Sequence, residues 1–221
     1  AEKLAISITE QFPKHQFGWK ALGAVLKKTN RVAETLVSCQ KVVEITPQDA
    51  EARNNLGITL KELGRLEESE ASLRQAIALK SGYAEAHSNL GITLQELGRL
   101  EEAKTSYRQA LALKPDYVEA HSNLGTTLQE LGRLGESEAS YRHAIALKPD
   151  YAEAHNNLGI TLKELGRLDA AEASLKQAIA LNSEYAEAYN NLGVTLQELG
   201  RLDEAKASLK QAIALNSEYA E

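Results

Sequence analysis

The sequence is poor in cysteine, proline and aromatic residues, and it contains no methionine. One cysteine, four prolines, one tryptophan and two phenylalanines occur among its 221 residues. A lone Cys39 excludes an internal disulfide and a paired-cysteine metal site. Because Cys39 falls on an apolar helical stripe, we expect it to be a buried structural thiol. The missing methionine suggests that the chain is a piece of a longer product.

Long apolar runs are also missing. No stretch of the sequence approaches the roughly 20 apolar residues that a membrane-spanning helix needs. The chain does not open with a charged and then apolar leader. We therefore expect no membrane partner and an aqueous, reducing compartment, with the cytoplasm favoured.

Positive charge is in short supply. Twenty-five Lys and Arg stand against 31 Asp and Glu, which gives a formal net charge of −6. Nucleic-acid binding needs a dense basic surface, because cationic side chains must displace counterions from phosphates. We therefore expect no nucleic-acid partner. The apolar share of 43% comes mainly from Ala and Leu, and this favours helix over strand.

A 34-residue unit repeats along almost the whole chain. It is clearest in the tripeptide Asn-Leu-Gly, which begins at Asn55, Asn89, Asn123, Asn157 and Asn191. With Gln16 as repeat position 1, six full repeats span residues 16–49, 50–83, 84–117, 118–151, 152–185 and 186–219. Residues 1–15 are then the second helix of a preceding repeat, and residues 220–221 begin a further one. A unit this small cannot bury its own core and must stack on its neighbours.

Each repeat is predicted to be a helical hairpin. In residues 152–185, apolar residues recur at three- and four-residue spacing in two segments, as on one face of a helix. Gly166 between the segments suits the left-handed conformation that ends a helix, and we expect Asp169 to cap the second helix. Gly159 and Ala171 are expected where the two helices approach most closely, because larger side chains would push the helices apart.

The repeats resemble the tetratricopeptide repeat (TPR) family. The resemblance is carried by Trp19, Leu22, Gly23 and Pro47 in the first full repeat and by Leu90, Gly91, Ala103, Tyr107, Ala110 and Pro115 in the third. It implies an all-α TPR solenoid, in which stacked hairpins form a right-handed superhelix. A second resemblance, to the TPR region of O-linked N-acetylglucosamine transferases, is carried by the string Ala-His-Ser-Asn-Leu, which starts at Ala86 and at Ala120.

Asparagine at repeat position 6 is the main candidate for a binding function. We call Asn55, Asn89, Asn123, Asn157 and Asn191 the asparagine ladder; the TPR resemblance implies that it lines the inner wall of the superhelix. A carboxamide carries donors and an acceptor, so a row of them can bind the backbone of an extended peptide. Alternatively, these residues bond neighbouring helices and set the angle between repeats, and both roles can hold together. The other predicted peptide-binding residues stand at positions 5 and 12: Asn54, Asn156, Asn190, Lys61, Gln95, Gln129, Lys163 and Gln197.

The residues beside the ladder indicate the kind of ligand. Glutamate recurs at positions 2 and 13, and an aliphatic residue occupies position 9 in four repeats, as Ile58, Ile92, Ile160 and Val194. An acidic face with an apolar strip favours an extended, neutral-to-basic peptide. The predicted partner is therefore a protein or peptide.

No catalytic, metal or cofactor site is predicted. His87, His121 and His155 recur 34 residues apart, which places them about 10 Å from one another by helix-packing distances. That separation is too large for a shared metal. Trp19 and Tyr189 occupy the same repeat position, so a packing role is expected.

Three functions stay open at this stage. The first is a non-catalytic interaction scaffold that holds an extended peptide through the asparagine ladder. The second is the substrate-recruiting arm of a larger enzyme, such as a glycosyltransferase or a sulfotransferase. The third is head-to-tail self-assembly, because the last helix is expected to be exposed and its Ala212, Ile213 and Leu215 resemble surfaces that other repeats bury.

Overall fold

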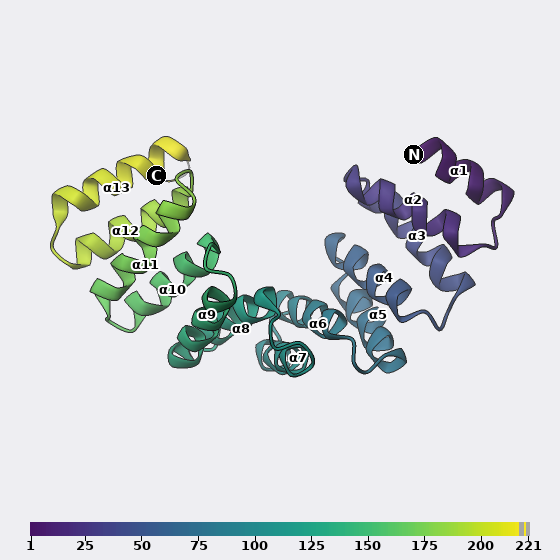
Figure 1. The fold of residues 1–221 in the computed structure, drawn as a ribbon, viewed down its shortest axis with the longest axis horizontal. Helices are drawn as coiled ribbons and strands as arrows, with labels where there is room; N and C mark the ends of the chain where they lie inside the picture. Colours follow the sequence, from purple (N-terminus) through teal and green to yellow (C-terminus); the bar gives the residue numbers. More distant parts are fainter. Residues whose placement is uncertain (217–218, 220–221) are drawn as a thin grey trace. The chain divides into compact units, whose positions relative to one another are not determined.

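The protein is built of α-helices that pack as antiparallel hairpins. The computed structural model describes residues 1–216 and 219, and this part contains thirteen helices and no strand. Contacts divide the chain into two compact units, residues 1–115 and residues 116–221. Unit 1 holds α1 (Glu2–Gln11), α2 (Gln16–Lys28), α3 (Val32–Ile45), α4 (Ala50–Glu62), α5 (Leu66–Leu79), α6 (Ala84–Glu96) and α7 (Leu100–Leu113). Unit 2 holds α8 (Val118–Glu130), α9 (Leu134–Leu147), α10 (Ala152–Glu164), α11 (Leu168–Leu181), α12 (Ala186–Glu198) and α13 (Leu202–Leu215) (Figure 1).

Each predicted full repeat contains one pair of helices. The strongest packing in the two units joins α2 to α3, α4 to α5, α6 to α7, α8 to α9, α10 to α11 and α12 to α13. Helix α1 lies within residues 1–15 and packs on α2. Residues 220–221, which were predicted to begin a further repeat, lie outside the described residues.

A residue with positive φ ends the first helix of every full repeat. Gly166 has φ +73° and takes the predicted left-handed conformation, as do Gly64, Gly98, Gly132 and Gly200. In the first full repeat the same place is held by Asn30, with φ 56°. Asparagine is one of the few residues with a Cβ that tolerate this conformation. The turn therefore keeps its geometry where glycine is missing.

The predicted helix cap at Asp169 is wrong. Helix α11 begins at Leu168, and its N-cap is Arg167, whose side chain makes no capping hydrogen bond. Asp169 lies within the first turn, where a negative charge still interacts favourably with the helix dipole. Asp49 shows what a side-chain cap requires, because it precedes α4 and its Oδ1 accepts from the backbone N–H groups of Glu51 and Ala52 at 2.9 and 3.1 Å.

Glycine at position 8 allows the two helices of a repeat to approach closely. A Cβ built on Gly159 would lie 2.6 Å from Cγ of Leu175 and 3.4 Å from the carbonyl oxygen of Ala171. The predicted close approach is confirmed, with Leu175 as the main contact. The same conflict would arise in four further pairs: Gly57 with Leu73, Gly91 with Tyr107, Gly125 with Tyr141 and Gly193 with Leu209.

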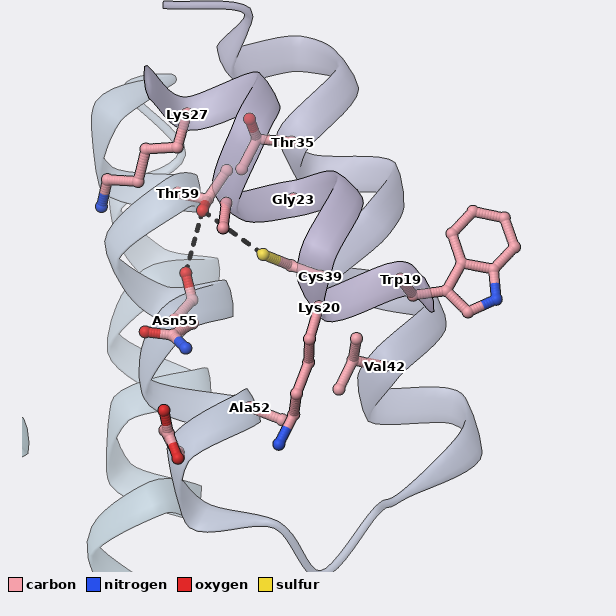
Figure 2. Close-up of a pocket in the computed structure, with 12 residues that line it drawn as sticks. Trp19, Lys20, Gly23, Lys27, Thr35, Cys39, Val42, Ala52, Asn55 and Thr59 are labelled. Atoms are coloured by element: carbon pink, nitrogen blue, oxygen red, sulfur yellow. Dashed lines mark hydrogen bonds between the residues drawn. The ribbon is translucent and has the colours of Figure 1, made fainter. Parts of the chain in front are cut away.

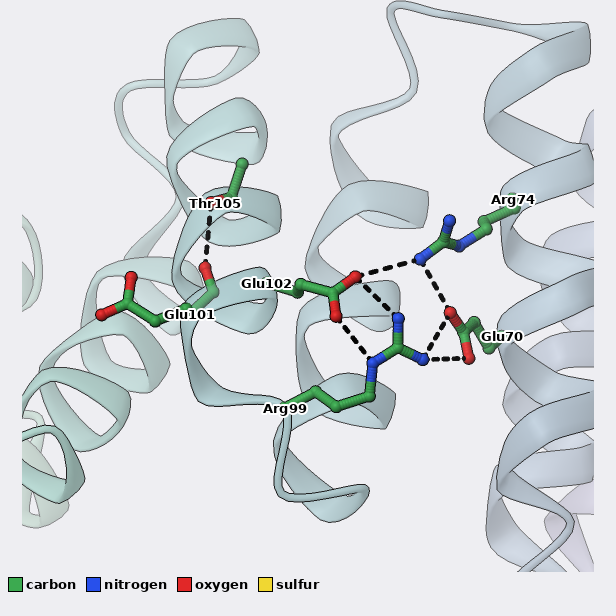
Figure 3. Close-up of polar contacts among 6 residues, drawn as sticks. All are labelled: Glu70, Arg74, Arg99, Glu101, Glu102 and Thr105. Atoms are coloured by element: carbon green, nitrogen blue, oxygen red, sulfur yellow. Dashed lines mark hydrogen bonds and ion pairs between the residues drawn. The ribbon is translucent and has the colours of Figure 1, made fainter.

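Glutamates at position 21, whose side chains are only 10–14% exposed, tie one repeat to the next. Both carboxylate oxygens of Glu70 accept from Nη1 of Arg99, at 2.8 and 2.7 Å, and Glu70 also pairs with Arg74 at 2.7 Å (Figure 3). In unit 2, the same arrangement joins Glu138 to Arg167 at 2.7 Å and Glu172 to Arg201 at 2.6 Å. Because each arginine stands in the turn of the following repeat, these pairs hold successive hairpins together.

The ion pairs of Glu172 predict how stability depends on pH. Hydrogen bonds from Lys176 and Arg201 lower the pKa of the Glu172 carboxyl below its usual value. A carboxyl whose pKa is lower in the folded state stabilises the fold above its unfolded-state pKa, and this stabilisation is lost as the pH falls through the folded-state pKa. We expect Glu172→Gln to make the urea midpoint fall less steeply below a pH of about 4.5.

Urea unfolding of the full chain, followed by circular dichroism between pH 6 and pH 3, measures this slope. Glu198→Gln is the matched control, because Glu198 is exposed and forms no ion pair within the described residues. Equal slopes for Glu172→Gln and Glu198→Gln would contradict the assignment.

Candidate functional site

The asparagine ladder lies on the first helix of the second to sixth full repeats, and a buried threonine bonds the backbone of each ladder residue. The backbone carbonyl of each ladder residue accepts a hydrogen bond of 2.8–3.1 Å from the hydroxyl four residues later, that of Thr59, Thr93, Thr127, Thr161 or Thr195. The side chain of Asn55 is exposed, and those of the other four are half-buried. Asn55 and Asn89 belong to unit 1, and the other three belong to unit 2.

The position-5 asparagines lie beneath the ladder. Asn54 and Asn156 are only 4% and 0% exposed. Oδ1 of Asn54 accepts from Nδ2 of Asn89 at 2.9 Å, and Oδ1 of Asn156 accepts from Nδ2 of Asn191 at 2.9 Å. The buried asparagine of one repeat thus orients the ladder residue of the next. Asn190, in the last full repeat, is half-buried.

Several position-12 residues bond across the repeats. Nζ of Lys61 lies 3.2 Å from Glu96, and Nε2 of Gln129 donates to Glu164 at 2.8 Å. Such pairs at the surface contribute little to stability, because water and salt screen them. Gln95 accepts from the Tyr107 hydroxyl at 3.3 Å. Among the other predicted position-12 residues, Lys163 is half-buried and Gln197 is exposed.

The glutamates at position 2 give the surface beside the asparagine ladder its negative charge. Glu51, Glu85, Glu119, Glu153 and Glu187 are all exposed. None of them forms an ion pair with a lysine or arginine in the part of the chain that the structure describes. The position-13 glutamates Glu62 and Glu96 are instead paired with Lys27 and Lys61. The uncompensated negative charge of the face therefore comes mainly from position 2.

Sequence analysis missed a cavity in unit 1, between α2, α3 and α4. It has a volume of about 280 Å³ and is partly open to solvent. Its wall includes Gly23, Cys39, Thr59 and Asn55, together with the charged side chains of Lys20, Lys27 and Glu51 (Figure 2). Sγ of Cys39 lies 3.6 Å from Oγ1 of Thr59. Cys39 is half-buried at the cavity wall, and not fully buried as predicted. Burial raises the pKa of its thiol, which disfavours the reactive thiolate.

Side chains at position 4 pack against the loops that precede their helices. Nε1 of Trp19 donates to the carbonyl oxygen of Pro13 at 2.9 Å. Nε2 of His87 lies 3.4 Å from the carbonyl oxygen of Ser81, and Nε2 of His155 lies 3.1 Å from that of Pro149. His121 stacks on His143, with ring centroids 5.3 Å apart. The predicted packing role is confirmed at these positions, and the described residues contain no group of three acidic, histidine or cysteine side chains placed to hold a metal.

The last described helix exposes less apolar surface than predicted. Ala212 of α13 is fully buried, because α13 packs on α12, so its predicted exposure is wrong. Ile213 and Leu215 are 39% and 36% exposed. Head-to-tail association through this helix stays a prediction. Within the described residues, no helix has both the length and the apolar character to span a membrane.

Comparisons with known proteins place these features among TPR proteins. Profiles described as TPR repeat match residues 59–98 and 94–132. Profiles described as tetratricopeptide repeat match residues 38–71, 116–184 and 151–218. No curated protein sequence matches significantly.

Solved structures share the fold at low sequence identity. YrrB, described as a TPR protein with an unusual peptide-binding site, is 25% identical with a TM-score of 0.67, covering 81% of this chain and 92% of its own. MamA is 22% identical with a TM-score of 0.69, covering 75% and 96% respectively. PilF of Pseudomonas aeruginosa is 18% identical with a TM-score of 0.80, covering 91% and 92%.

Proposed function

The chain belongs to the tetratricopeptide repeat family, and on this basis we propose that it is a non-catalytic scaffold that binds an extended peptide through the asparagine ladder. The carboxamides of Asn89 and Asn191, each held by a buried asparagine at 2.9 Å, carry this proposal. A carboxamide can form about four hydrogen bonds. One structural bond therefore leaves a donor and an acceptor for a peptide group.

Orientation before binding favours a ligand role for the ladder. A side chain that is already held in one rotamer loses less conformational freedom on binding, which otherwise costs about 0.5–1.5 kcal/mol for each immobilised side chain. The structural bonds to Asn54 and Asn156 therefore support peptide binding and do not compete with it. In this proposal the two buried asparagines position the ladder, and the exposed and half-buried ones contact the ligand.

The charge of the face supports a neutral-to-basic ligand. The position-12 and position-13 side chains partly neutralise each other, as Lys61 and Glu96 do. The exposed position-2 glutamates keep their charge and would attract lysine or arginine side chains of the ligand. The resemblance to YrrB, which is described as having a peptide-binding site, supports a peptide as the ligand class.

Removal of three ladder carboxamides tests the proposal. We expect the triple variant Asn89→Ala, Asn123→Ala and Asn157→Ala to lose at least about tenfold in affinity, since several hydrogen bonds of about 0.5–1.5 kcal/mol are lost together. The measurement is binding to an array of unrelated extended peptides, followed by calorimetry on the tightest binders of the wild-type chain.

The control removes the same number of carboxamides from the second helices. Gln109, Gln177 and Gln211 are exposed on α7, α11 and α13, and their alanine variants should bind as the wild type does. Circular dichroism confirms that both triple variants are folded. Unchanged affinity in a folded ladder variant would show that the asparagine ladder does not bind the peptide.

A further inference from the structure

The first full repeat differs from the others at position 24, where the second helix packs on the first. Leucine or tyrosine stands there in the other five repeats, as Leu73, Tyr107, Tyr141, Leu175 and Leu209. The first four of these side chains are completely buried, and all five lie against the glycine at position 8. In the first full repeat, position 24 is Cys39, which is too small to fill this space.

The cavity is the volume that this substitution leaves open. A Cβ built on Gly23 would contact only Cβ of Ser38, at 3.4 Å. A Cβ built on the glycine at the same position of the other five repeats would lie 2.6–2.8 Å from a leucine or tyrosine side chain. Ala24 adds little bulk, and the result is a space of about 280 Å³. An apolar cavity of about 150 Å³ is large enough to bind benzene. The space in unit 1 is therefore large enough for one substituted aromatic ring.

The same repeat leaves the neighbouring ladder residue unpaired. Asn89 and Asn191 each donate to an asparagine at position 5 of the preceding repeat. For Asn55 that position is Lys20, whose Nζ lies 2.8 Å from Oδ2 of Asp49. The side chain of Asn55 is exposed and has no hydrogen-bond partner among the described residues. Its carboxamide thus lies at the cavity with all of its hydrogen-bonding capacity free.

The tyrosines of the later repeats indicate which group the cavity suits. The Tyr107 hydroxyl donates to Gln95 at position 12, and the Tyr141 hydroxyl lies 2.9 Å from Oγ1 of Thr126 at position 9. In the first full repeat, position 12 is Lys27, which also lines the cavity and whose Nζ lies 3.5 Å from Oε1 of Glu62. An ammonium group has three N–H donors, so it can donate a hydrogen bond to a phenol oxygen and keep its ion pair with Glu62.

We propose that the cavity between α2, α3 and α4 binds a tyrosine side chain of a peptide ligand, with Asn55 bonding the peptide group beside that tyrosine. The ring occupies the volume that Leu or Tyr fills in the other repeats, and the hydroxyl lies near Lys27. The peptide part of this inference rests on the proposed function. The ring-binding part depends only on the cavity.

Two small probes separate these parts. The first is p-cresol, which has the ring and hydroxyl of tyrosine, and the second is N-acetyl-tyrosinamide, which adds two peptide-like groups. Both are titrated into the full chain, and nitrogen-15 NMR follows the backbone signals of Cys39, Thr59 and Asn55. We expect saturable shifts with both probes, and about threefold to tenfold tighter binding of N-acetyl-tyrosinamide through hydrogen bonds to Asn55.

Variants at two positions give opposite patterns. Cys39→Tyr and Cys39→Leu copy the other repeats, so they should raise the melting temperature and abolish the shifts with both probes. Cys39→Ser keeps the cavity and should keep binding. Asn55→Ala should reduce the affinity for N-acetyl-tyrosinamide to that for p-cresol, whereas Gln109→Ala, on an exposed carboxamide of α7, should change neither.

The outcomes distinguish this inference from the proposed function. If p-cresol gives no saturable shift, or binds equally to Cys39→Tyr, the cavity is not a ring-binding site. Equal affinity of the two probes would show that Asn55 does not bond the peptide groups of N-acetyl-tyrosinamide. If p-cresol binds as expected but the triple ladder variant still binds peptides normally, the cavity stands and the proposed function fails.

Discussion

Replacing Gly57 by alanine is expected to lower the free energy of unfolding, although alanine is the better helix former. The new Cβ would lie 2.6 Å from Cγ of Leu73 and 3.3 Å from the carbonyl oxygen of Ser69. Overpacking of this kind costs about 1–3 kcal/mol, and the gain in helix propensity returns about 1 kcal/mol. We expect a net loss of up to about 2 kcal/mol, and a larger one for Gly57→Leu.

The same substitution at Gly23 should instead raise the free energy of unfolding. Gly23 occupies the same repeat position, but its added Cβ would meet only Cβ of Ser38 at an ordinary 3.4 Å. The helix gains about 0.5–1 kcal/mol without a clash. Urea unfolding of both variants measures the two changes. Destabilisation of equal size at Gly23 and Gly57 would show that the Leu73 contact is not the cause.

Replacing Leu175 by alanine is expected to have the largest effect of any truncation considered. Leu175 is completely buried and packs with Leu192, Leu196 and Ala205 in one core cluster. Truncation of a buried leucine costs about 2–5 kcal/mol, because transfer energy is lost and a cavity remains. The two helices already approach closely here, because a Cβ built on Gly159 would lie 2.6 Å from Cγ of Leu175, and this limits how far they can collapse onto the gap. We therefore expect a value near the upper end, about 4 kcal/mol.

Leu202→Ala removes the same atoms from a leucine that is 65% exposed. Surface changes of this kind usually stay within about 0.5 kcal/mol of zero. Thermal and urea unfolding of the two variants should therefore differ by several kcal/mol. A loss of less than about 1 kcal/mol for Leu175→Ala would mean that the two helices do not close on this side chain as described.

Features that belong to a single repeat could be predicted from the sequence. Gly166 ends its helix with positive φ, and Gly159 marks the close approach of two helices, because both roles depend on residues within one hairpin. The error at Asp169 arose from the helix boundary. The residue before a helix must be the cap, and the helix begins at Leu168, two residues earlier than that prediction required.

Features that join two repeats could not be predicted in the same way. The hydrogen bond between Asn54 and Asn89 spans 35 residues, and the pair between Glu70 and Arg99 spans 29. Position along one helix does not reveal such partners, because they depend on how the next hairpin is stacked. For this reason Asn54 and Asn156 were predicted to bind the peptide, whereas the structure buries them beneath the ladder.

The cavity could have been found in the sequence by comparing the repeats with one another. Cys39 and Lys20 depart from the residues that the other repeats have at the same positions. Each departure alone is an ordinary variation. Only the structure shows that both lie beside Asn55, one leaving a space and the other leaving a carboxamide unpaired.

The ion pair between successive hairpins also affects how the repeat array can change in length. Each pair takes its glutamate from one repeat and its arginine from the next, as with Glu138 and Arg167 and with Glu172 and Arg201. Tandem duplication of the segment coding for residues 152–185 would therefore create a new boundary that already carries both partners. Duplication of residues 84–117 would instead bring Lys104, which stands at the glutamate position, next to an arginine of like charge. Recombination at the first place would therefore add a boundary with its own ion pair, whereas recombination at the second place would add a boundary without one.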